Sequence, residues 1–282
     1  MRRWLPWLVL AAMLAAGMAQ GRAWLEGHRQ ASPQASLLYL PQGPYLRALS
    51  LGHEETLADL LYIWSIQYYS NYDDDSRFEY LREIFAGAIT ELDPRYVEVY
   101  LVGAMIMSLE ARNTDMALEL LDLGLERMPD NWELAYWAGW EAYNDRRYLR
   151  ARDYWRRASG APGAPPQLTR LAARMLEKAG SLEDALAEYQ RILEDPPDEK
   201  TAQVVAMWLE QTRTRIAVRD TRRALTAFRQ RHGRCPRRLE ELLHSGLLSA
   251  LPRAASGRPL SFDPDACTVD SPKGGVVEGG GR

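Results

Sequence analysis

The chain has 282 residues, of which 46% are hydrophobic and 26% charged, and its formal net charge is −3. This composition is that of a folded protein rather than a disordered one, and the length suffices for one large or two small domains. The slightly acidic balance argues against nucleic acid as a partner, because such partners require a strongly basic surface.

The first 25 residues have the features of an export segment. Two arginines at positions 2 and 3 precede an apolar run over residues 4–19, which ends in a small-x-small sequence that a signal peptidase could cut before Gln20. The run is shorter than the ~20 residues that span a bilayer as a helix, although residues 23–25 could extend it. Residues 1–25 are therefore predicted to be either a cleaved signal peptide or a retained membrane anchor. Since the arginines stay inside, we expect the rest to be exported, either periplasmic or anchored in the inner membrane and facing the periplasm.

Residues 37–94 are expected to form an N-terminal helical cap or a degenerate repeat, of the kind that solenoids need at their ends. An extended segment (37–41) and a turn at Gly43-Pro44 lead to a helix over residues 54–70. A second helix is predicted over residues 77–91. The apolar stripe that we expect the first helix to bury consists of Leu57, Leu60, Leu61, Trp64 and Tyr68.

The middle of the chain repeats with a period of 34 residues. Ala117, Ala151 and Ala185 occupy one position of three successive units, and the large residues Leu121, Trp155 and Tyr189 follow four places behind them. Small residues at a helix crossing let two backbones approach closely. The pattern resembles the tetratricopeptide repeat family, and the resemblance implies a mainly α, right-handed solenoid of helical hairpins.

Three tetratricopeptide repeats are predicted over residues 95–198, followed by a long capping helix over residues 199–232. The expected helix pairs are 96–111 with 114–127, 132–145 with 148–159, and 166–179 with 182–194.

Residues 233–271 have a different character and are expected to form a small α+β module. A short helix is predicted at 239–243, and residues 260–263 and 267–269 are predicted to pair as a hairpin around Pro264-Asp265. From residue 272 to the end, the glycine-rich tail is predicted to be disordered.

This module is similar to the C-terminal part of type II secretion major pseudopilins. The similarity rests on a long helix that leads through His232-Gly233-Arg234-Cys235-Pro236 and Gly246-Leu247-Leu248 to Ser256-Gly257-Arg258-Pro259-Leu260 and Phe262-Asp263. The resemblance implies a calcium site near the hairpin, for which Asp263, Asp265 and Asp270 are the candidates. Three carboxylates are few for a cation that takes about 6–8 oxygen ligands, so solvated aspartates of a turn are the favoured alternative and no metal is expected.

The chain has two cysteines, Cys235 and Cys267, and both fall in this module. An oxidising compartment would allow a disulfide between them, which would stabilise a module too small for a large core. Two unpaired thiols are the alternative.

No catalytic pattern is visible in the sequence. The four histidines are scattered and none has the spacing of a metal site. The nucleophile elbow of hydrolases and the phosphate-binding loop of nucleotide-binding proteins are both missing. We therefore expect neither enzymatic activity nor a cofactor.

The tetratricopeptide resemblance implies that the first helix of each pair lines a concave groove. The predicted groove positions that could bind a partner are Tyr136, Trp137, Trp140, Tyr143 and Asn144 in the second unit, and Arg170 and Arg174 in the third. The matching positions of the first unit are Val99, Val102, Gly103 and Ile106, so the groove would run from apolar through aromatic to charged. Aromatic rings with polar tips suit peptide binding. Burial of Trp137 and Trp140 in the core is the alternative of equal weight.

Together these features predict a non-enzymatic scaffold for protein–protein interaction. We expect it on the outer face of the inner membrane, in a secretion or type IV pilus-like assembly whose components would be its partners. The layout is also similar to that of exported bacterial tetratricopeptide proteins, through Leu40-Pro41-Gln42-Gly43 and Ala58-Asp59-Leu60-Leu61. The alternative is an accessory structural subunit of a larger membrane complex, respiratory or photosynthetic.

Overall fold

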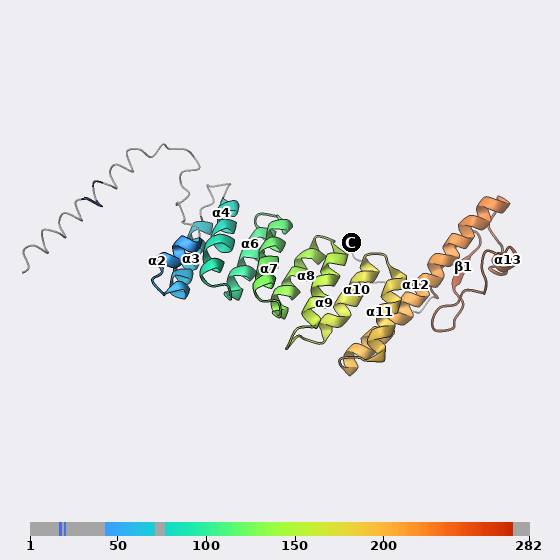
Figure 1. Cartoon of the computed structure of the whole chain (residues 1–282). Helices are drawn as coiled ribbons and strands as arrows, with labels where there is room; N and C mark the ends of the chain where they lie inside the picture. Colours follow the sequence, from blue (N-terminus) through green and yellow to red (C-terminus); the bar gives the residue numbers. More distant parts are fainter. Residues whose placement is uncertain (1–16, 19, 21–42, 71–76, 273–282) are drawn as a thin grey trace, which may run out of the picture. The chain divides into compact units, whose positions relative to one another are not determined.

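The computed structural model describes residues 17, 18, 20, 43–70 and 77–272 (Figure 1). They fall into two compact units, one ending at Asp93 and the other beginning at Pro94. Within this described part, none of the helices combines the length and the apolar character that crossing a bilayer requires. Apart from residues 17, 18 and 20, the predicted signal peptide or anchor lies outside the described residues, as do the extended segment at 37–41 and residues 273–282 of the tail.

The first unit is mainly helical in its described residues. It contains α2 (Gly43–Leu49), α3 (Glu54–Tyr69), α4 (Arg77–Glu83), the π-helical segment η2 (Ile84–Ile89) and α5 (Thr90–Leu92). The turn predicted at Gly43-Pro44 is wrong, because these residues begin α2, where the fixed φ of proline suits the first helical turn. A Cβ at Gly43 would lie 2.6 Å from the Cβ of Glu91, so glycine is what lets α2 lie against α5.

The predicted apolar stripe of α3 is also wrong in part. Leu60 is 59% exposed, whereas Ala58 and Ser65 are fully buried. Helix α3 packs against η2, and its two buried residues are both small, which permits close approach of the helices. The Ser65 hydroxyl donates a hydrogen bond to the carbonyl of Tyr62 at 2.6 Å, which satisfies this buried polar group.

The second unit begins with three helical hairpins stacked in order (Figure 1). The pairs are α6 (Val97–Leu109) with α7 (Thr114–Arg127), α8 (Trp132–Asn144) with α9 (Tyr148–Ser159), and α10 (Gln167–Lys178) with α11 (Leu182–Glu194). The long helix α12 (Glu199–His232) then packs against α11 and α10. The predicted fold class is confirmed: the protein is mainly α, with hairpins of the tetratricopeptide type.

The 34-residue period has a direct physical basis in this stack. Ala117, Ala151 and Ala185 are all fully buried, as the close helix crossings require. At Gly139 the approach is closest, because a Cβ there would lie 2.9 Å from Cε2 of Trp155 and closer still to two other indole atoms. The indole Nε1 of Trp155 donates to the carbonyl of Tyr136 at 3.0 Å, which fixes the ring between α8 and α9.

The turn inside each hairpin repeats as well. Arg112, Arg146 and Gly180 lie 34 residues apart, and their φ angles are 52°, 60° and 87°. Each is therefore left-handed, a conformation that glycine adopts without a steric cost and other residues only at some strain. Two of the three hairpins thus use arginine where the backbone favours glycine.

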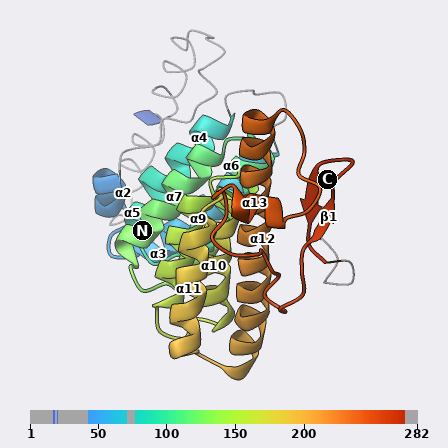
Figure 2. The same cartoon turned by 90° about the vertical axis from the view of Figure 1, so that its right-hand side faces the viewer.

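The C-terminal module is built on the second half of α12 (Figure 2). It contains α13 (Glu240–His244) and an antiparallel hairpin of β1 (Ser261–Asp263) and β2 (Thr268–Asp270), in which Phe262 pairs with Val269. A disulfide joins Cys235 to Cys267, whose Cα atoms are 5.8 Å apart. The core of the module consists of Ala224, Leu225, Phe228, Leu242, Ala254, Leu260 and Val269.

Candidate partner-binding face

Helix α8 has one buried side and one exposed aromatic side. Its buried residues are Leu134, Ala135, Ala138, Gly139 and Ala142, and its N-terminus is capped by the Asn131 side chain, which accepts from the amide of Leu134 at 3.0 Å. On the other side, Trp137 is 41% exposed and Trp140 is 40% exposed. We call this side the α8 face and define it as Glu133, Trp137, Trp140, Glu141 and Asn144. The two tryptophans are therefore not part of the buried core.

Half-buried tyrosines support the exposed rings. Tyr136 meets Trp137 edge-on, with ring centroids 5.5 Å apart. Tyr143 lies between Trp140 and the buried Trp155, at centroid distances of 5.8 and 5.9 Å. A chain of ring contacts thus runs from the surface into the core and limits the rotamers of the tryptophans before anything binds.

Helix α6 packs beside α8. Burial raises the pKa of the Glu141 carboxyl above its usual value, and the nearby Ser108 hydroxyl of α6 acts in the opposite direction. One helical turn before these two residues lie Trp137 and Met105, and Met105 is also exposed. The neighbourhood of the α8 face therefore combines apolar surface with a carboxylate that is poorly hydrated.

The predicted groove positions of the first unit are wrong for three residues out of four. Val99, Gly103 and Ile106 are buried, and Val102 is partly buried. The exposed apolar residues of α6 are instead Met105 and Leu109. The exposed stripe of α6 is therefore rotated around the helix relative to the stripe of α8.

Arg170 and Arg174 do not join the α8 face. Nη1 of Arg170 approaches Oγ1 of Thr201 at 3.5 Å, and Arg174 lies over the ring of Trp208 at 4.8 Å from its centroid. Both partners belong to α12, which packs on α10 as the first helix of a further repeat would. These two positions lie at the contact between α10 and α12, and their role in binding a partner stays a prediction.

Arg174 belongs to a buried charge cluster that we call the Glu177 cluster, formed by Arg174, Glu177, Tyr189, Trp208 and Arg215. The Glu177 side chain is only 3% exposed; it lies 2.5 Å from Nη1 of Arg174 and pairs also with Arg215. It accepts a hydrogen bond from the Tyr189 hydroxyl at 3.1 Å. Burial, together with the nearby Glu177 charge, raises the pKa of Tyr189 far above its usual value. The cluster joins α10, α11 and α12.

The aspartates proposed for calcium have other roles in the structure. The Asp263 carboxylate accepts from the amides of Asp265 and Ala266 at 2.9 and 3.0 Å, which closes the hairpin turn. Asp270 pairs with Arg222 of α12. No group of three potential metal ligands occurs among the residues that the structure describes. Asp263 and Asp270 are therefore engaged within the protein.

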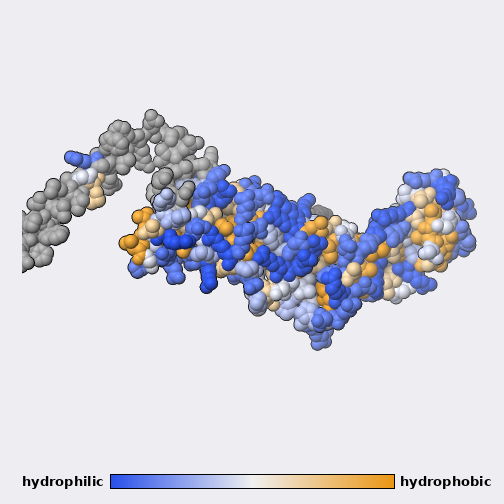
Figure 3. All heavy atoms as spheres, viewed as in Figure 1, coloured by the Kyte–Doolittle hydropathy of each residue, from blue (hydrophilic) through white to orange (hydrophobic). Residues whose placement is uncertain are grey.

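A second exposed apolar surface lies on the first unit, over α2 and α3 (Figure 3). We call it the α2–α3 apolar surface, and its exposed members are Tyr45, Leu49, Leu51, Leu60, Ile63 and Ile66. Six large apolar side chains within a short stretch are more than the scattered exposure that folded proteins usually show.

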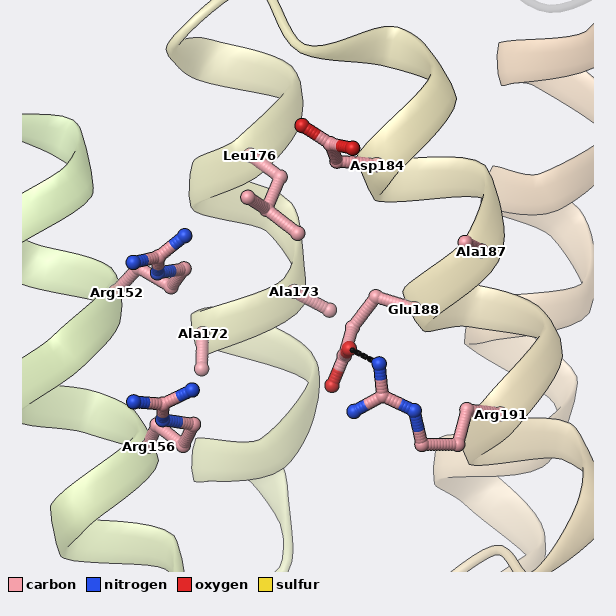
Figure 4. Close-up of a pocket in the computed structure, with 9 residues that line it drawn as sticks. All are labelled: Arg152, Arg156, Ala172, Ala173, Leu176, Asp184, Ala187, Glu188 and Arg191. Carbon is pink, nitrogen blue, oxygen red and sulfur yellow. Dashed lines mark ion pairs between the residues drawn. The ribbon is translucent and has the colours of Figure 1, made fainter.

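A hollow of about 260 Å³ opens between α9 and α11, with α10 as its floor (Figure 4). Arg152 and Arg156 line it from α9, while Glu188 and Arg191 line it from α11 and form an ion pair of 2.7 Å with each other. None of its lining residues lies on α8. The hollow carries charges of both signs and shows no cluster of groups typical of catalysis.

Comparisons with known proteins place the chain only at the level of fold. No model of a known protein family matches it, and no curated protein matches it. Among solved structures, the MamA RS-1 ArsTM double mutant is 15% identical over 56% of this chain and 84% of that chain, with a TM-score of 0.37. MamA AMB-1 is 21% identical over 57% and 97%, with a TM-score of 0.34. At these scores the likeness carries no argument about function.

Proposed function

We propose that this protein is a non-enzymatic scaffold that binds a segment of another protein on the α8 face. The observation that carries the proposal is the exposure of Trp137 and Trp140, which are 41% and 40% exposed on a helix whose opposite side is buried. Tryptophan is enriched among the residues that dominate binding energy. The tyrosines beneath hold both rings in place, so little entropy would be lost when a partner docks.

We further propose that the scaffold acts on the outer face of the inner membrane, in a secretion or type IV pilus-like assembly. The export-like residues 1–25 and the pseudopilin-like module support this location. The disulfide between Cys235 and Cys267 is of a kind that persists in oxidising compartments such as the periplasm.

The test is a crosslinking pull-down of the full chain from its native cells, compared with a Trp137→Ala/Trp140→Ala double variant. Truncating both aromatic residues is expected to weaken capture of the partner at least ~30-fold, since the loss of a single hot-spot residue costs about 2 kcal/mol or more. The control is Leu149→Ala, which removes an exposed apolar side chain from α9 of the same unit. Equal capture by the double variant and the parent chain would contradict the proposal.

A second candidate function is favoured by the α2–α3 apolar surface. Exposed side chains such as Leu51, Leu60 and Ile63 suit contact with lipid or with a neighbouring subunit. The protein would then be an accessory structural subunit of a larger membrane complex. The test is copurification with a respiratory or photosynthetic complex. Loss of copurification in the Leu60→Ser/Ile63→Ser variant, with retention in the Trp137→Ala/Trp140→Ala variant, would favour this candidate over the first.

A further inference from the structure

Helix α8, which carries the α8 face, and its neighbour α6 contain acidic but no basic residues. Neither α6 nor α8 has a lysine, arginine or histidine, whereas together they contain Glu98, Glu133 and Glu141. The next helix along the chain, α9, is the opposite, with arginines at positions 150, 152, 156 and 157. The basic side chains of the second hairpin therefore lie on α9 and not on α8.

Two of the three cations of α10, Arg170 and Arg174, are engaged by other groups. Arg170 is directed at Thr201, and Arg174 is held by Glu177 and by the ring of Trp208. Both are engaged at the contact between α10 and α12. The α8 face therefore keeps an acidic character that another molecule can complement.

The spacing on α8 places carboxylates on both sides of an exposed ring. Glu133, Trp137 and Glu141 follow one another at intervals of four residues, so they form one line along the helix surface. The face of an indole ring attracts a lysine or arginine cation within about 6 Å of its centroid. A half-buried carboxylate such as Glu141 has lost part of its hydration, so an added cation would stabilise its ionised form.

We propose that the segment bound by the α8 face is basic, with lysine or arginine side chains next to apolar ones. The cations would lie against Trp137 between Glu133 and Glu141, and the apolar side chains would cover Trp140 and Met105. An acidic segment would instead bring like charges against two carboxylates, which is unfavourable. This inference rests on the proposed function of the α8 face and specifies the chemistry of its partner.

The test measures binding of three fluorescent amphipathic peptides to the full chain by anisotropy. The peptides share the same leucines, and their polar positions are all lysine, all glutamine or all glutamate. The lysine peptide is expected to bind about tenfold or more tightly than the glutamine peptide, and to weaken as salt is raised to about 0.5 M. The glutamate peptide is expected to bind least.

Variants connect that preference to the α8 face. The Glu133→Gln/Glu141→Gln variant is expected to bind the lysine peptide about tenfold more weakly and with a smaller salt dependence. Its affinity for the glutamine peptide is expected to stay unchanged. The control is Glu126→Gln/Glu194→Gln, which removes two exposed carboxylates from α7 and α11 and is expected to have no effect.

The outcomes separate this inference from the proposed function. If all three peptides bind equally and Trp137→Ala/Trp140→Ala abolishes binding, the face binds proteins but the inference of a basic partner is wrong. Preference for the glutamate peptide, or no binding of the lysine peptide, also overturns the inference, and the pull-down then decides the proposed function separately. If the lysine peptide binds but neither the Glu133→Gln/Glu141→Gln nor the Trp137→Ala/Trp140→Ala variant changes its affinity, both the inference and the proposed binding on the α8 face are overturned.

Discussion

Replacing Glu177 by alanine is expected to lower the free energy of unfolding by about 3 kcal/mol, which would make it among the most damaging single substitutions in the repeats. Glu177 is a carboxylate with a 3% exposed side chain that pairs with Arg174 and Arg215 and accepts from Tyr189. Removing one member of a buried ionic group leaves the others desolvated without a counter-charge, which typically costs about 3–5 kcal/mol. We place the effect near the lower limit because Arg215 is more than half exposed and can be hydrated.

Urea unfolding followed by circular dichroism measures this effect. The matched control is Glu210→Ala on α12, which breaks an ion pair with Arg213 whose two side chains are about half exposed. That variant is expected to stay within about 0.5 kcal/mol of the parent chain, as exposed pairs usually do. Equal losses for the two variants would show that the Glu177 cluster does not hold α10, α11 and α12 together.

Removing the disulfide with Cys235→Ser/Cys267→Ser is expected to destabilise the C-terminal module by about 3–4 kcal/mol. The two cysteines are 32 residues apart, and closing a loop of this length restricts the unfolded chain by roughly that amount. The module has few buried side chains to compensate, chiefly Phe228, Leu242, Leu260 and Val269. The loss should therefore appear as local opening rather than as unfolding of the repeats.

Amide hydrogen exchange distinguishes the two possibilities. Exchange in β1, β2 and α13 is expected to rise in the double serine variant, while exchange in α8 to α11 stays unchanged. The parent chain treated with reductant serves as the control and should show the same rise in exchange as the double serine variant. Unchanged protection of the hairpin would mean that α12 holds the module without the disulfide.

The helix pairs could be predicted because their cause is local and repeated. A small residue every 34 positions marks each close crossing, as the burial of Ala117, Ala151 and Ala185 shows. The left-handed turns at Arg112 and Arg146 could not be anticipated from residue type, because arginine does not favour that conformation. Glycine does favour it, and Gly180 occupies the same position in the third hairpin. Similarly, no residue type marks the π-helical segment η2 within the predicted helix at 77–91.

The errors in the first unit and in the groove share one physical origin. Hydrophobic periodicity predicts that large apolar residues form the buried side of α3, but Ala58 and Ser65 are its fully buried residues and Leu60 is exposed. Arg170 and Arg174 contact Thr201 and Trp208, which come from a distant part of the sequence. In both cases a tertiary contact, which periodicity along one helix cannot reveal, decides which side is covered.

The exposure of the tryptophans on the α8 face is also decided by tertiary contacts. The sequence left Trp137 and Trp140 equally divided between core and groove, and only their exposure separates the two. The acidic composition of α6 and α8 was readable from the start. The structure adds that Arg170 and Arg174 of α10 contact α12 rather than these carboxylates.

Site-specific photocrosslinking in the native cells tests the central claim most directly. A photoreactive amino acid would replace Trp140 on the α8 face, Leu149 on α9 or Leu60 on the α2–α3 apolar surface, each in an otherwise unchanged full chain. A crosslink to one discrete partner from position 140, and not from position 149 or 60, is the result that the α8 face predicts. Crosslinks from position 60 or 149 with none from position 140 would contradict it.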